Sequence, residues 1–170
     1  EAWVAANIRG VDKVWNVLAN QTVMTDIRLG AAVLNFDQWD GYAPDRDRVL
    51  TDITEQGVEN LIVLTGDIHL SGIGQLTTTA NPTTAVGIEF VTTSISSGGN
   101  VPPETQGLLK ALSNIIDAEA SHRGYTLHTI TPETWTAQYR IVDDATVENS
   151  GVSDWKTFSV TAGTAAVAEI

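Results

Sequence analysis

The chain has 170 residues, of which 42% are hydrophobic, and this is enough to bury the core of one compact domain or of part of a larger one. Nine basic and 21 acidic residues give a net charge of −12, which excludes a surface built to neutralise the phosphates of a nucleic acid. The sequence shows no signal sequence and no apolar run near the roughly 20 residues of a transmembrane helix, and it lacks the cysteines that disulfides, thiol nucleophiles or Cys-ligated metals require.

The first quarter of the chain predicts a short helix, a strand and a long loop. Residues 1–6 form the helix, and no capping residue precedes Glu1, which indicates a fragment or a processed product. Residues 14–22 form a strand-like run that ends with Asn20 and Gln21, two amides placed to face a site. Residues 24–42 lack periodicity, and loops of this length inside compact domains are often functional.

A helix and a buried strand follow. The helix covers residues 43–57, with proline in its first turn, apolar side chains at helical spacing and Gly57 as its C-cap. Its charged first turn, residues 45–48, is expected on the surface. Residues 60–65 form a continuous apolar run, which is typical of a strand buried on both faces of a parallel or mixed sheet.

The remainder is richer in strands. Residues 72–79 and 86–92 are expected to pair, residues 94–103 to form a loop, and residues 104–119 to form a helix. Residues 125–130 and 135–142 predict an antiparallel hairpin, and residues 155–161 predict the final strand, after which the last ten residues fray. The pattern indicates an α/β (α+β) fold with a mixed sheet.

The sharpest candidate site is the motif Gly66-Asp67-Ile68-His69 at the carboxyl end of the buried strand. In extended backbone Asp67 and His69 would point to the same side, about 6.5 Å apart at Cα, and a carboxylate with an imidazole can share a cation such as zinc, iron or manganese. Open α/β sheets place their sites at this edge. The alternative is a turn in which Asp67 caps backbone amides and His69 is structural.

Two ligands do not complete a catalytic metal centre, which needs at least three. The other histidines, His122 and His128, are expected to be structural, so the missing ligands are carboxylates or amides of this chain, or residues outside it. A second candidate is the loop of residues 37–42, whose aromatic and acidic side chains either wall a substrate pocket or, as the favoured alternative, anchor the loop to the core.

The chain carries five motifs that resemble those of one family. They are Trp15 to Gln21, Asp37 to Tyr42 with Arg46, Leu64 to His69, Glu89 to Ser97, and Arg123 to Tyr125. In this order they resemble the alkaline phosphatase D (PhoD-like) family, metal-dependent phosphatases and phosphodiesterases of the calcineurin-like metallophosphoesterase superfamily. Residues 113–116 depart from the Asn-Pro-His segment of many relatives, which puts local substrate contacts in doubt.

The resemblance implies a four-layer αββα sandwich, with residues 1–170 as the C-terminal portion of a single catalytic domain. The chain would supply about one sheet and its helices, and the N-terminal half of the domain would be absent from it. Asp67 and His69 match the family's metal ligands. The candidate substrate pocket is assigned to four residues: Asn20, Trp39, Asp40 and Tyr42.

By the same resemblance, the parent protein hydrolyses phosphate esters by activating water at a centre of two or more metal ions, calcium and/or iron. It would be secreted, periplasmic or on the cell surface, and the 170-residue chain alone would be inactive. The alternative is a non-catalytic binding or assembly module that exposes one apolar sheet face and associates with its missing half.

Overall fold

A computed structural model describes residues 2–8, 13–99, 102 and 104–170. The helices are α1 (Ala2–Asn7), the 3₁₀ helix η1 (Trp39–Tyr42), α2 (Ala43–Glu55) and α3 (Thr105–Lys110). The strands are β1 (Asn16–Ala19), β2 (Leu61–Thr65), β3 (Ser71–Thr77), β4 (Ala85–Val91), β5 (Ile115–Glu119), β6 (Arg123–Ile130), β7 (Thr134–Val142), β8 (Val152–Thr161) and β9 (Val167–Glu169). Within these described ranges, no helix is long and apolar enough to cross a membrane.

The strands form two sheets, one mixed and one antiparallel. The five-stranded sheet has the order β1-β2-β4-β3-β5, with β1, β2 and β4 parallel and β3 antiparallel to both β4 and β5. The four-stranded sheet has the order β6-β7-β8-β9 and is antiparallel throughout. The predicted mixed sheet, the pairing of β3 with β4 and the hairpin of β6 and β7 are therefore confirmed.

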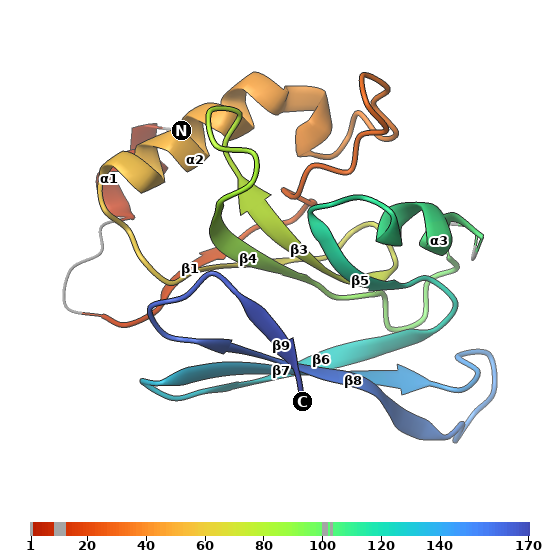
Figure 1. Cartoon of the computed structure of the whole chain (residues 1–170). Coiled ribbons are helices and arrows are strands. Elements are labelled where there is room, and N and C mark those ends of the chain that lie inside the picture. Colours follow the sequence, from red (N-terminus) through yellow and green to blue (C-terminus); the bar gives the residue numbers. More distant parts are fainter. Residues whose placement is uncertain (1, 9–12, 100–101, 103) are drawn as a thin grey trace.

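The two sheets pack face to face, and α1 and α2 cover the outer face of the five-stranded sheet (Figure 1). The core between the sheets contains Ile62, Ile73, Ile88, Phe90, Trp135, Ala137, Tyr139, Phe158 and Val160. The expectation of a single sheet with one exposed apolar face is wrong, because β7 and β8 alternate and bury their apolar sides against the first sheet. The fold is α+β and contains both sheets of a sandwich.

Helix α2 forms where the apolar spacing predicts it. Val49, Leu50 and Ile53 are buried against the five-stranded sheet, and Gly57 follows the helix with a φ of +66°, as a helix stop requires. The expectation of an exposed first turn is wrong at Arg46, which is only 6% exposed and pairs with the buried carboxylate of Asp40.

The predicted helix over residues 104–119 is wrong in its second half. Helix α3 ends at Lys110, and residues 115–119 form strand β5 on the edge of β3. The apolar spacing fits either structure, and the open edge of β3 decides between them by supplying hydrogen-bond partners for the backbone.

Two other ends of elements differ from expectation. Strand β1 spans four residues rather than residues 14–22, and β8 begins at Val152. The last ten residues contain β9, which pairs with β8, so residues 155–161 are not the final strand and the tail is not frayed throughout. Glu1 of the predicted first helix and residues 100, 101 and 103 of the predicted loop lie outside the described residues.

Candidate functional site

The carboxyl ends of β1, β2 and β4 meet at one edge of the five-stranded sheet. Just past β2, the Gly66 N–H donates to the carbonyl of Gln21 at 3.3 Å, and the Thr92 N–H donates to the carbonyl of Thr65 at 2.9 Å. Residues 66–69, called the 66–69 turn below, therefore begin where three parallel strands end, which is the usual place for sites in such sheets.

The backbone of the 66–69 turn is bent rather than extended. Asp67 and His69 both have positive φ, of +68° and +60° respectively, and the Ile68 N–H donates to the Gly66 carbonyl at 2.8 Å. The predicted extended geometry is therefore wrong, because β2 ends at Thr65. Left-handed backbone costs a non-glycine residue roughly 1–2 kcal/mol, and such residues concentrate at functional sites.

His69 has one ring nitrogen in a hydrogen bond and one that bonds to none of the described residues. Its Nδ1 lies 2.7 Å from the carbonyl oxygen of Gly98, and since a carbonyl only accepts, Nδ1 carries a hydrogen, which in the neutral imidazole leaves the lone pair on Nε2. Arg123 Nη1 donates to the backbone carbonyl of His69 at 2.6 Å and to Thr93 Oγ1 at 3.1 Å. This Nδ1–H···O=C arrangement is the one that metal-ligating histidines adopt.

Asp67 shows the same division between a bound and a free atom. Its Oδ2 accepts a hydrogen bond from Gln38 Nε2 at 2.7 Å, and in the part of the chain that the structure describes its Oδ1 has no partner. Nor does Asp67 accept a backbone N–H there, unlike Asp26, whose Oδ1 accepts that of Arg28. This geometry does not match the alternative in which Asp67 caps a turn.

The free atoms suit a cation. A carboxylate oxygen of Asp67 and the Nε2 of His69 are ligands for iron, zinc or manganese, and the oxygen suits calcium as well. The described residues hold no group of three or more His, Cys, Asp or Glu side chains that could bind a metal ion. The two residues fit a metal but do not complete its coordination.

Three of the four candidate pocket residues line one cavity of about 470 Å³ at the end of β1. They are Asn20, Trp39 and Tyr42, and Gln38 lines the same cavity. Because Gln38 also bonds to Asp67, the cavity lies next to the 66–69 turn. Trp39 also packs against the core beneath α2, so it both walls the cavity and anchors the loop.

Asp40, the fourth candidate, does not line this cavity. It is 4% exposed, its Oδ1 lies 2.5 Å from Arg46 Nη1, and its Oδ2 accepts the Ile27 N–H at 3.0 Å. Burial raises the pKa of Asp40, and the hydrogen bond from Arg46 opposes that rise. Asp40 therefore fixes the loop from within and is not among the residues that line this cavity.

Glu89 is a further residue that the sequence reasoning missed. It is fully buried in β4, and its carboxylate accepts the Met24 and Thr25 N–H groups at 2.8 and 2.7 Å and the Thr65 hydroxyl at 3.0 Å. Burial raises the pKa of Glu89. A glutamate inside an apolar strand is the one signal that could have found it, and its role is to fix the start of the loop after β1.

The other two histidines have structural partners. His128 lies between Phe90 and Trp135, and its Nδ1 accepts the Trp135 indole N–H at 2.9 Å. Burial lowers the pKa of His128. His122 Nδ1 lies 3.0 Å from Glu119 Oε1. Both match the expectation of structural histidines.

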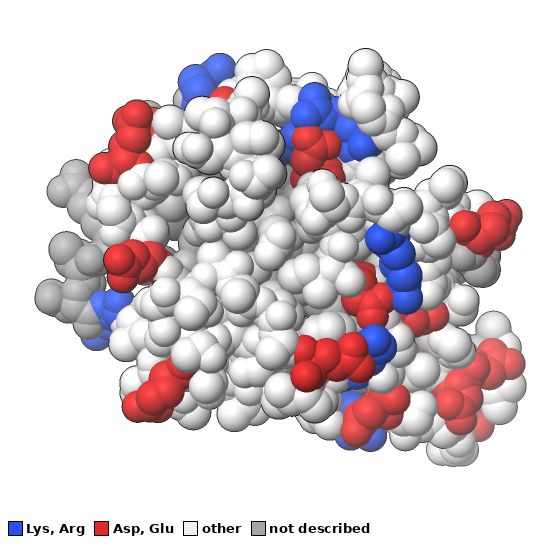
Figure 2. Space-filling view, viewed as in Figure 1, with Lys and Arg blue, Asp and Glu red and all other residues white. Residues whose placement is uncertain are grey.

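Charged side chains of both signs are interspersed on the face shown in Figure 2. Lys and Arg lie beside Asp and Glu there and do not gather into a continuous basic area.

Comparison with known proteins gives consistent results. The model of the PhoD-like phosphatase family matches residues 1–139. Alkaline phosphatase D of Bacillus subtilis (strain 168) is 34% identical over 166 residues, which cover 93% of this chain and 28% of that protein. A solved structure of PhoD superposes with a TM-score of 0.86 at 31% identity and covers 99% of this chain and 34% of that one. The chain spans about a third of the length of these relatives, and it belongs to the PhoD-like phosphatase family.

Proposed function

We propose that residues 1–170 form the C-terminal portion of the catalytic domain of a metal-dependent phosphoester hydrolase, to which Asp67 and His69 contribute metal ligands. The observation that carries the proposal is the 66–69 turn. The backbone of this turn is strained at both residues, and the turn stands where three parallel strands end. On each side chain one ligand atom has no partner among the residues with a described position. Membership of a phosphatase family supports the reaction class.

In the proposed centre the residues of this chain bind and orient. Asp67 supplies a negative oxygen and His69 a neutral imidazole nitrogen, whose tautomer the Gly98 carbonyl fixes. The Arg123 guanidinium holds the turn by donating a hydrogen bond to the backbone carbonyl of His69. When two or more cations are bound, with calcium and iron expected from the family, they supply Lewis-acid stabilisation of the phosphoryl oxygens and lower the pKa of water.

The cavity beside the turn is the proposed place for the organic part of a phosphate mono- or diester. Trp39 and Tyr42 offer aromatic surface, and the Asn20 amide stands at its edge, with Nδ2 donating to the Thr22 carbonyl at 2.6 Å. A site of this composition is mostly apolar with a few polar groups, as small-molecule sites usually are.

Three further proposals complete this function. The remaining ligands come from outside the described residues of this chain, so the 170-residue chain alone is inactive. The parent enzyme acts outside the cytoplasm, secreted, periplasmic or on the cell surface, as the family resemblance implies. Its partners are a phosphate-ester substrate and the rest of the catalytic domain.

The test uses the full-length protein that contains this chain. Asp67→Asn and His69→Ala should each lower bound metal and the hydrolysis of a phosphodiester such as bis-p-nitrophenyl phosphate by at least about 100-fold. Asp154→Asn is a matched change on β8, whose aspartate pairs with Arg140, and it should keep both properties. Wild-type metal content and activity in both turn variants would contradict the proposal.

A further inference from the structure

We propose that Gln38 is a positioning residue for Asp67, holding one oxygen of its carboxylate so that the other faces the metal. The inference rests on the proposed function, in which Asp67 binds metal, and adds to it a residue from the loop before η1. That loop also lines the substrate cavity, so Gln38 links the cavity to the metal ligand.

The orientation of the Gln38 amide is fixed by its neighbours. Gln38 is 1% exposed, and its Oε1 accepts the Val23 N–H at 2.5 Å. A backbone N–H only donates, so the oxygen must face Val23 and the amide nitrogen must face Asp67. Since that nitrogen only donates, Asp67 Oδ2 is the acceptor of this hydrogen bond.

The backbone around Gln38 is also held in place. The Trp39 N–H donates to the Val23 carbonyl at 3.1 Å, and the Gly41 N–H donates to the Gln38 carbonyl at 3.0 Å. Val23 is therefore bonded to this loop at both of its backbone groups. These hydrogen bonds hold Gln38 in one orientation, so the amide hydrogen that it donates to Asp67 has a fixed position.

The Gln38 hydrogen bond matters for Asp67 because the Asp67 side chain is exposed. An exposed carboxylate samples several rotamers, and ordering it when a ligand binds costs free energy. The Gln38 bond restricts that sampling before the metal arrives. The Gly98 carbonyl orients His69 in the same way, so each proposed ligand has one atom bonded to the protein and one atom that no described residue contacts through a hydrogen bond.

The experiment titrates the metal-free, full-length protein with Mn²⁺ and follows free Mn²⁺ by electron paramagnetic resonance. Gln38→Leu and Gln38→Met remove both hydrogen bonds, and methionine keeps the length of the side chain. The Kd for Mn²⁺ should rise about 10- to 100-fold in both variants, as is typical when an outer partner of a ligand is lost. In the loaded enzyme kcat should fall by a larger factor than KM changes.

Gln138→Met is the matched control. Gln138 also donates to an aspartate, Asp154 Oδ2 at 3.1 Å, but on the exposed surface. The Kd of the Gln138→Met variant for Mn²⁺ should equal that of the wild type. Melting of each metal-free variant shows whether it is folded.

The outcomes separate the two claims. Wild-type affinity in a folded Gln38 variant, together with lost affinity in Asp67→Asn, would overturn the role of Gln38 alone. Wild-type affinity in Asp67→Asn would overturn the proposed function itself. Failure of both Gln38 variants to fold would also overturn the positioning role, because it would show that folding requires Gln38.

Discussion

At the scale of single residues, buried charges shape the loop that leads to the site. Arg46 is inserted beneath the loop and reaches two acidic side chains, Asp40 at 2.5 Å and Asp26 at 3.1 Å. A guanidinium with several fixed donors is suited to such a buried position. The loop therefore has a defined shape although it contains little regular structure.

We predict that Asp40→Asn lowers the free energy of unfolding by about 2–4 kcal/mol, because it leaves the buried Arg46 charge with less compensation. Urea denaturation of the 170-residue chain measures this change. Asp45→Asn is the control, since the pair of Asp45 with Arg48 is on the surface and should contribute less than about 1 kcal/mol. Equal losses in the two variants would contradict the buried role of Asp40.

Some of these residue roles could be predicted from the sequence and others could not. The chemistry of Asp67 and His69 marks them as candidate ligands, because carboxylate and imidazole near a strand end suit a cation. The left-handed backbone and the Gln38 contact depend on how segments distant in the chain pack together. Arg46 was expected on the surface because the charge pattern of a helix turn does not show which acids will meet it.

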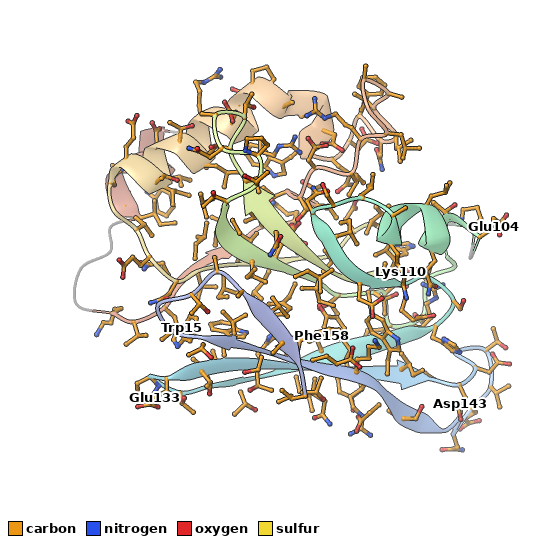
Figure 3. All side chains as sticks on the ribbon, viewed as in Figure 1. Trp15, Glu104, Lys110, Glu133, Asp143 and Phe158 are labelled. Atoms are coloured by element: carbon orange, nitrogen blue, oxygen red, sulfur yellow. The ribbon has the colours of Figure 1, made fainter. Side chains whose placement is uncertain are left out.

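At the scale of elements, ion pairs connect β5 to helix α3 and to the four-stranded sheet. Asp117 of β5 lies 2.6 Å from Lys110 of α3, labelled in Figure 3, and 2.9 Å from Lys156 of β8. Burial acts to raise the pKa of Asp117, but its hydrogen bonds to the two lysines and to the Ala118 N–H outweigh burial and lower the pKa below 3.8.

This lowered pKa makes a pH prediction. A carboxyl whose pKa is lower in the folded state adds stability above its ordinary pKa and loses it as the pH falls through the folded value. Asp117→Asn should therefore lower the free energy of unfolding by about 1–2 kcal/mol at pH 7. The difference from wild type should shrink once the pH falls below 3.8. A difference independent of pH would contradict the ion-pair role.

Prediction from sequence also succeeded unevenly among the elements. Helix α2, strand β2 and the hairpin of β6 and β7 have strong local signals, which for β2 is a continuous apolar run, and all three were predicted. Strands β5 and β9 exist because the edges of β3 and β8 offer hydrogen-bond partners, which local sequence does not show.

At the scale of the whole molecule, the packing of two sheets defines the fold. Phe158 of β8, labelled in Figure 3, lies in the core between the sheets together with Tyr139. The Tyr139 hydroxyl donates to the Gly72 carbonyl of β3 at 2.8 Å, so the sheets are joined by a hydrogen bond as well as by apolar contact.

Phe158→Ala should lower the free energy of unfolding of the chain by about 3–5 kcal/mol, because it opens a cavity between the sheets. Tyr125→Ala, at a 37% exposed position on β6, should cost less than about 1.5 kcal/mol. Urea denaturation followed by circular dichroism compares the two, and similar losses would contradict a shared core.

The net charge of −12 also acts on the whole molecule, since it favours bound cations over bound anions. This agrees with the proposal that the chain contributes metal ligands and that the rest of the domain supplies the remaining ligands and the phosphate contacts. The net charge and the family could be read from the sequence, whereas the packing of two sheets against each other became visible only in the structure.

The most direct test is a crystal structure of the full-length protein with anomalous scattering measured at the edges of its bound metals. We predict an anomalous peak within about 2.0–2.6 Å of an Asp67 carboxylate oxygen and a peak within about 2.0–2.3 Å of His69 Nε2. Metal peaks elsewhere in the protein, with neither residue in contact, would contradict the assignment of the 66–69 turn as a metal site.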